Sequence, residues 1–94
     1  LGMNSYLAVA RGSKQSAKFI VMEYNGRVTD DEKIALIGKG LCFDSGGYNL
    51  KPGNAMKGMH GDMGGAAAVI AAMGAIAEAK LGINVTAVIP PVKI

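Results

Sequence analysis

Residues 33–90 contain a strand-like apolar run, a glycine-rich loop, a helix-like segment and a second strand-like run, in that order. The first run, 33–38, holds the four consecutive apolar residues "IALI", which is typical of a central parallel strand that is buried on both faces. Segment 61–82 repeats apolar residues at the spacing of a helix, and segment 84–90 is rich in strand-forming residues. Because a helix between two parallel strands crosses over their sheet, this order predicts an α/β layered fold.

The ends of the predicted helix carry residue types that commonly bound helices. Asp62 stands at its start, where an aspartate can cap free backbone N–H groups. Lys80 and Gly82 stand at its end, where a positive charge and a glycine at the C′ position are favoured. Upstream, residues 18–24 predict a further strand, and the polar residues 25–32 predict an exposed turn.

Composition limits the classes of protein to consider. The 94 residues are half apolar, so they predict an ordered domain or a piece of a larger one. The net charge is +3, but the basic residues are scattered, which argues against a nucleic-acid surface. The longest apolar run is shorter than the ~20 residues that a membrane span needs, so no membrane partner is expected. A single cysteine and no visible signal peptide predict a cytoplasmic protein without a disulfide framework.

The glycine loop at 38–52 carries charged residues that suit a metal site. Lys39 follows the first strand and Asp62 begins the helix, so both are expected beyond the carboxyl ends of the strands, where such sheets form their sites. Asp44 and Lys51 lie in the loop. Carboxylates gathered in one cleft need a cation between them, and oxygen ligands suit Mg²⁺, Mn²⁺ or Zn²⁺. Burial beside such an ion can lower the pKa of Lys39 until its neutral amine becomes a ligand.

Two other interpretations of the loop stay open. Its glycines can simply form a tight turn, with Lys39 and Lys51 in solvent and Asp62 acting only as a helix cap. The tripeptide Gly38-Lys39-Gly40 also resembles part of a phosphate-binding loop, but the chain contains no G-x-x-x-x-G-K-[ST] pattern.

Three features of the sequence together match one known pattern. "GKGLCFDSGG" fits a G-K-G-x-x-F-D-S-G-G run, Lys51 follows Asp44 by seven residues, and "GDMGGAAAV" fits a D-M-x-G-A-A helix start. The opening "LGMNSYLAVARGS" and the strand after it fit the start of the same catalytic domain. This joint pattern resembles the leucyl aminopeptidase family, the cytosol aminopeptidases, and the resemblance covers residues 1–90.

The resemblance implies a three-layer α/β/α fold with a central mixed, largely parallel sheet. Residues 1–94 would form the N-terminal portion of a metallo-aminopeptidase catalytic domain. It also implies an exopeptidase that removes N-terminal residues such as leucine from peptide substrates, with two divalent metal ions, manganese or zinc, activating a water molecule. Assembly as a homo-oligomer, a hexamer, and a place in the cytoplasm are further implications.

The resemblance also assigns roles to individual residues of this chain. Lys39 would bind one metal ion through its amine, Asp44 would bridge both ions, and Asp62 would bind the Lys39 ion. Lys51 would stay cationic and polarise the scissile carbonyl. Met59 would line the pocket for the first side chain of the substrate, with plain core packing as the alternative.

The family pattern contains further residues that this chain does not match. A downstream N-T-D-A-E-G-R motif completes both metal sites, and its arginine holds a bicarbonate that acts as general base; the motif does not occur here. Two ions need about four ligands each, more than one amine and two carboxylates supply. Residues 1–94 are therefore expected to be a fragment or an incomplete chain that is inactive alone. His60 stands where the family commonly has a basic residue, and it is expected beside the site or on the surface.

Two other functions stay open. A non-catalytic relative could keep the fold and a weak metal site as a structural or binding subunit. Because some family members bind DNA, DNA binding is a third and weaker option.

Overall fold

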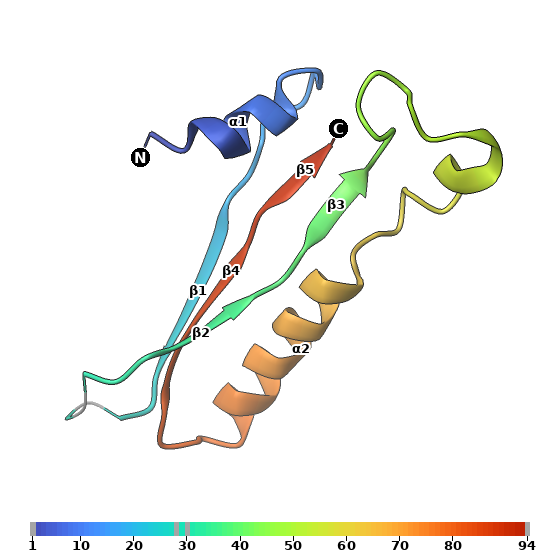
Figure 1. Cartoon of the computed structure of the whole chain (residues 1–94). Helices are drawn as coiled ribbons and strands as arrows, with labels where there is room; N and C mark the ends of the chain where they lie inside the picture. The colour runs from blue at the N-terminus through green and yellow to red at the C-terminus, as the bar shows by residue number, and fades with distance from the viewer. Residues whose placement is uncertain (1, 28, 30, 94) are drawn as a thin grey trace.

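The computed structural model describes residues 2–27, 29 and 31–93. The elements of this part of the chain are, in order, α1 (Asn4–Ala10), β1 (Ile20–Asn25), β2 (Ile34–Ile37), β3 (Gly40–Phe43), the 3-10 helix η1 (Gly53–Met56), α2 (Gly64–Glu78), β4 (Asn84–Ile89) and β5 (Pro91–Lys93). Figure 1 shows α2 running alongside the strands and α1 lying near the end of β5. No helix in these residues has both the length and the apolar character that crossing a membrane requires.

The main sheet has β4 at its centre. Its strand order is β1-β4-β2, with β1 antiparallel and β2 parallel to β4. The strands predicted at 18–24, 33–38 and 84–90 are confirmed, with bounds that differ by one or two residues. The predicted central position of the strand at 33–38 is wrong, because β2 lies at the edge of this sheet and exposes Ile34 and Ile37. An apolar run does not by itself distinguish a central strand from an edge strand.

A second sheet of two strands continues from the first. β3 pairs in parallel with β5, so that Gly40 lies opposite Pro91 and Leu41 opposite Val92. β2 passes into β3, and β4 into β5, along the same direction (Figure 1). The prediction that 38–52 is a loop throughout is wrong for β3, because β5 supplies backbone partners from a distant part of the chain. The parallel pairs β2–β4 and β3–β5 and the antiparallel pair β1–β4 make the chain a mixed α/β unit, as predicted.

The apolar face of α2 covers the main sheet. Met73 of this helix packs with Val85 and Ala87 of β4 in the buried core. Half-buried apolar side chains of α2, β1, β2 and the residue before β4 surround this core: Met22, Tyr24, Leu36, Val69, Ile76 and Ile83. The helix predicted over 61–82 is confirmed, although it is shorter at both ends.

Both predicted caps of this helix are wrong. Met63, not Asp62, is the N-cap residue, and no side chain caps the helix there. The helix ends at Glu78, and Lys80 rather than Gly82 adopts a positive φ, of 52°. The carboxylate of Asp62 pairs with an ammonium group instead, because a hydrogen bond between two charged groups is stronger than one to a neutral backbone N–H.

The apolar stretch before residue 11 forms α1, a helix that the sequence does not predict. The Tyr6 hydroxyl donates to the carbonyl oxygen of Lys18 and lies 3.3 Å from that of Pro91. The Tyr6 ring meets the Phe19 ring edge-on, at 5.7 Å between centroids. Burial raises the pKa of Tyr6, and the charge of Cys42 adds to this effect. These contacts tie α1 to β5 and to the segment before β1.

Candidate functional site

The first ion pair of the site lies where β2 passes into β3. Lys39 Nζ is 2.8 Å from Asp62 Oδ2. Backbone hydrogen bonds hold both residues, since the Ala66 N–H donates to the Lys39 carbonyl at 2.9 Å and the Leu41 N–H donates to the Asp62 carbonyl at 3.1 Å. The backbone on both sides of this ion pair is therefore fixed by the start of α2 and by β3.

Two glycines allow the first turn of α2 to approach Lys39 so closely. A Cβ atom on Gly65 would lie 2.9 Å from the Lys39 nitrogen and 3.2 Å from its carbonyl oxygen. A Cβ atom on Gly38 would lie 2.8 Å from the Gly65 carbonyl oxygen and 3.0 Å from the Ala66 Cα. Each contact involves backbone atoms that cannot rotate away, so the absence of a side chain at both positions allows α2 to lie this close to Lys39.

Replacing Gly65 by alanine is expected to destabilise the protein that carries these residues by about 1–3 kcal/mol, the usual cost of overpacking. The added methyl group would push α2 away from Lys39 and weaken the Ala66–Lys39 hydrogen bond. Gly64→Ala is the matched control, because a Cβ atom on Gly64 meets nothing within 4 Å. Denaturant unfolding compares the two variants, and equal free energies of unfolding would show that the close approach has no energetic role.

The second ion pair lies in the loop after β3. Lys51 Nζ is 3.6 Å from Asp44 Oδ2. The loop folds back on itself, since the Gly46 N–H donates to Asp44 Oδ1 at 2.7 Å and the Lys51 N–H donates to the Ser45 carbonyl at 3.0 Å. Gly46 has a φ of +83°, and a Cβ atom there would lie 2.9 Å from Lys51 Cγ. A glycine at this position therefore brings Lys51 next to Asp44.

The two ion pairs differ in their exposure to solvent. The side chains of Lys51 and Asp44 are 29% and 16% exposed, compared with 62% and 34% for Lys39 and Asp62. Water therefore screens the Lys51–Asp44 pair less than the Lys39–Asp62 pair.

Lys39 is a protonated ammonium group in this arrangement. Its hydrogen bond to Asp62 raises its pKa, the charge of Asp62 raises the pKa further, and the charge of Asp44 adds a smaller increase. Desolvation acts in the opposite direction but does not prevail. In the metal-free chain the pKa of Lys39 is raised, so a bound cation would have to displace its proton. The lowering of this pKa by burial beside a metal ion stays a prediction. Asp44 is therefore one of the charges that favour the protonated form of Lys39.

The donor groups of these residues fit part of a metal site. Each aspartate lies beside an ammonium group, which balances its charge as a metal ion would. Carboxylate oxygens and a deprotonated amine suit Mn²⁺ or Zn²⁺. Among residues 2–27, 29 and 31–93, no group of three or more His, Cys, Asp and Glu side chains comes together as a candidate metal site. Lys39, Asp44 and Asp62 alone therefore fall short of a complete set of metal ligands.

Two further residues of interest lie in the turn after η1. Met59 is half-buried, and its contact with a substrate side chain stays a prediction. His60 is exposed, and its ring centroid lies 4.8 Å from that of Phe43. The sequence does not predict this role of Phe43, because no spacing or motif pairs it with His60.

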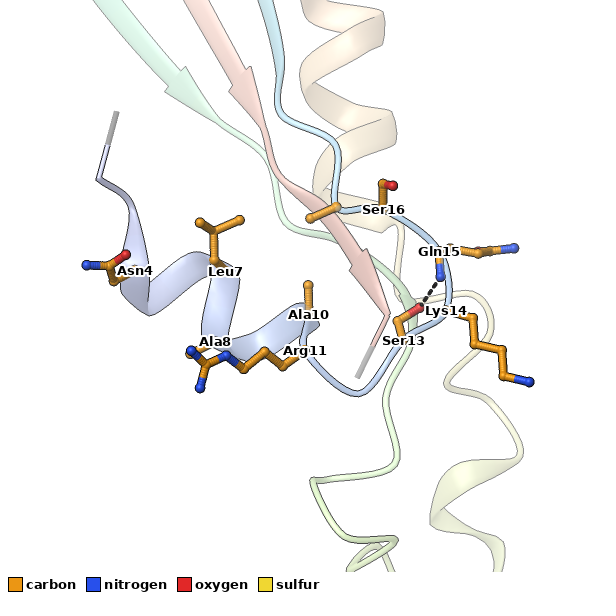
Figure 2. Close-up of a pocket in the computed structure, with 10 residues that line it drawn as sticks. Asn4, Leu7, Ala8, Ala10, Arg11, Ser13, Lys14, Gln15 and Ser16 are labelled. Atoms are coloured by element: carbon orange, nitrogen blue, oxygen red, sulfur yellow. Dashed lines mark hydrogen bonds between the residues drawn. The ribbon is translucent and has the colours of Figure 1, made fainter.

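A hollow of about 500 Å³ lies apart from these ion pairs, between α1 and the turn that follows it. It is lined by polar and apolar residues, with Arg11 and Lys14 as its cations. Figure 2 shows Arg11 lying along α1 while Lys14 points away from it, toward the opposite side. The two cations do not converge on one point, so this hollow has no grouped charges that would bind a ligand.

Sequence comparison finds relatives along nearly the whole chain. A family model described as "Cytosol aminopeptidase family, catalytic domain" matches residues 1–93. The "Probable cytosol aminopeptidase" of Clostridium tetani (strain Massachusetts / E88) is 53% identical over 89 residues, which are 95% of this chain and 18% of that protein. The chain thus spans less than a fifth of the length of this curated relative.

Solved structures give the same result. The cytosol aminopeptidase from Coxiella burnetii matches with a TM-score of 0.84 at 32% identity, over 95% of this chain and 19% of that one. The "Bottromycin maturation enzyme BotP in complex with Mn" matches with a TM-score of 0.80 at 37% identity, over 98% of this chain and 20% of that one. The predicted fold class, a portion of an α/β/α domain, is confirmed. By sequence and by fold, the chain belongs to the cytosol aminopeptidase family.

Proposed function

We propose that the complete protein carrying these residues is a metal-dependent aminopeptidase, and that residues 1–94 form the N-terminal portion of its catalytic domain. The observation that carries this proposal is the 2.8 Å contact between Lys39 Nζ and Asp62 Oδ2, within electrostatic range of Asp44. Membership in the cytosol aminopeptidase family supports it. Its substrates are peptides with a free N-terminal residue such as leucine.

The proposed ligands are Lys39 and Asp62 for one ion and Asp44 as a bridge to a second, with Mn²⁺ or Zn²⁺ as the metal. The manganese named for the BotP structure supports metal dependence of the complete protein. When bound, a pair of such ions supplies a water molecule of lowered pKa and positive charge for the developing oxyanion. Bicarbonate as general base, the hexamer and the place in the cytoplasm stay predictions.

The side chains of this chain have distinct tasks in the proposed site. The raised pKa of Lys39 means that its amine must lose a proton before it can act as a ligand, so metal binding is expected to release a proton. Lys51 has no such task and keeps its charge beside Asp44. That charge is available to polarise the scissile carbonyl, where negative charge develops in the transition state.

A non-catalytic metal-binding relative is the second candidate function. The described residues supply fewer grouped acidic and histidine ligands than a metal site needs, and this observation favours weak metal binding by residues 1–94 alone. We therefore expect these 94 residues by themselves to hydrolyse no aminoacyl substrate in the presence of Mn²⁺ or Zn²⁺.

Hydrolysis of a leucyl anilide tests the proposed function. The complete protein is expected to lose activity after treatment with a chelator and to regain it when Mn²⁺ or Zn²⁺ is added. Asp62→Asn is expected to prevent this recovery because it removes the charge that faces Lys39. Asp31→Asn, the same chemical change at an exposed residue outside the site, is the control. Full activity of the metal-free protein, or of Asp62→Asn, would contradict the proposal.

A further inference from the structure

A contact between two rings joins the segments that carry the two candidate metal-binding aspartates. Phe43 directly precedes Asp44, and His60 lies two residues before Asp62. The ring centroids of Phe43 and His60 are 4.8 Å apart and their planes are tilted by 44°. This separation lies in the range in which aromatic rings attract each other.

The backbone ties Asp62 to β3 but does not tie the loop that begins at Asp44 to the turn that carries His60. The hydrogen bond from Leu41 to Asp62 fixes β3, but Asp44 lies three residues further along, about 10 Å in an extended chain. Among the described residues, no backbone hydrogen bond outside the helices and strands joins segment 43–51 to segment 53–61. The ring contact is therefore a tie between the segments beyond Leu41.

Phe43 is itself held in place by the neighbouring strand β5. Lys93 lies opposite Phe43 in the pairing of β3 with β5, and its Nζ atom is 5.7 Å from the centre of the Phe43 ring. At this distance the ammonium group is attracted to the ring. Phe43 is also half-buried, so His60 packs on a ring whose position is already restrained.

We propose that His60 is a positioning residue that holds Asp44 and Asp62 at the separation needed for metal binding, through its contact with Phe43. This inference rests on the proposed function, because it takes both aspartates as ligands. His60 acts through the face and edge of its ring and contacts no metal ion. A residue with another aromatic ring can therefore replace it, whereas a residue without a ring cannot.

Titration of the complete, metal-free protein with Mn²⁺ alone tests this role. His60→Ala is expected to weaken Mn²⁺ binding about three- to tenfold, the range that an aromatic pair contributes. His60→Phe is expected to bind within about twofold of the unchanged protein, because the ring contact persists. Lys57→Ala is the control, since Lys57 is an exposed residue of the same turn. Because the ring contact is present in the metal-free chain, the thermal midpoint of metal-free His60→Ala should fall by only about a few degrees. The midpoints of metal-free His60→Phe and Lys57→Ala should stay unchanged.

A double-mutant cycle separates the ring contact from other roles of His60. In a Phe43→Leu background, His60→Ala is expected to weaken Mn²⁺ binding by less than about twofold, because the partner ring is already absent.

Equal Mn²⁺ affinity for His60→Ala and Lys57→Ala would overturn the inference. Failure of His60→Phe to restore binding would also overturn it, by making the imidazole a direct ligand. If Asp44→Asn and Asp62→Asn leave the Mn²⁺ affinity unchanged, the proposed function itself fails. If both aspartate variants weaken Mn²⁺ binding but His60→Ala leaves it unchanged, this inference alone fails.

Discussion

Replacing Lys51 by alanine is expected to lower the kcat of the complete protein about 10²–10³-fold, the usual cost of removing a group that stabilises charge in the transition state. Lys51 is 29% exposed, and the folded-back loop holds it 3.6 Å from Asp44. Its charge is therefore placed and partly shielded from water before a substrate binds. Steady-state hydrolysis of a leucyl anilide measures kcat, and metal analysis of the same sample is expected to show an unchanged metal content.

Lys57→Ala is the matched control for this experiment. Lys57 is an exposed lysine after η1, so its loss changes the net charge equally and should leave kcat unchanged. An unchanged kcat for Lys51→Ala would remove Lys51 from the catalytic site. Loss of the metal from that variant would instead assign Lys51 a role as a ligand or as the partner that positions Asp44.

Replacing Asp44 by asparagine is expected to weaken metal binding by more than about 100-fold, because even groups that only orient a metal ligand contribute 10–100-fold. Asp44 is proposed to bridge both ions, so its loss would affect the two together. The substitution keeps the size of the side chain but removes the negative charge that faces Lys51. Metal analysis after dialysis measures the result, with Asp31→Asn as the control for the chemical change.

The outcome that would contradict the bridging role is retention of two ions per chain by Asp44→Asn. Retention of one ion would limit Asp44 to a single metal position, leaving Lys39 and Asp62 as the ligands of the other. The experiment therefore separates a bridging aspartate from a terminal one.

The elements that the sequence predicts correctly are those with a local periodic signal. The apolar spacing of 61–82 indicates α2, and the strand-forming residues of 18–24 and 84–90 indicate β1 and β4. β3 is different, because it exists through its pairing with β5 about fifty residues later, and no local pattern reports such a partner. α1 has seven residues and no side-chain cap; its contacts through Tyr6 come from tertiary structure.

In the candidate site, too, the residues are predictable from local motifs, but their contacts depend on the folded chain. Its charged residues can be identified from the sequence by their motifs, but the motifs do not state that Lys39 pairs with Asp62 and Lys51 with Asp44. Asp62 at a helix start predicts a cap, and competition from the nearby ammonium group makes that prediction wrong. The steric role of Gly65 depends on the close approach of α2 to Lys39, a distance that only the folded chain defines.

A crystal structure of the complete protein loaded with Zn²⁺, with the metal located by anomalous scattering, tests the proposed metal site most directly. We predict one ion within about 2.0–2.2 Å of Lys39 Nζ and of a carboxylate oxygen of Asp62. A second ion should lie about 3.5–4 Å from the first, with Asp44 bound to both. Zinc bound elsewhere, with Lys39 Nζ still 2.8 Å from Asp62 Oδ2 as in the metal-free chain, would contradict the proposal that these residues form the metal centre of an aminopeptidase.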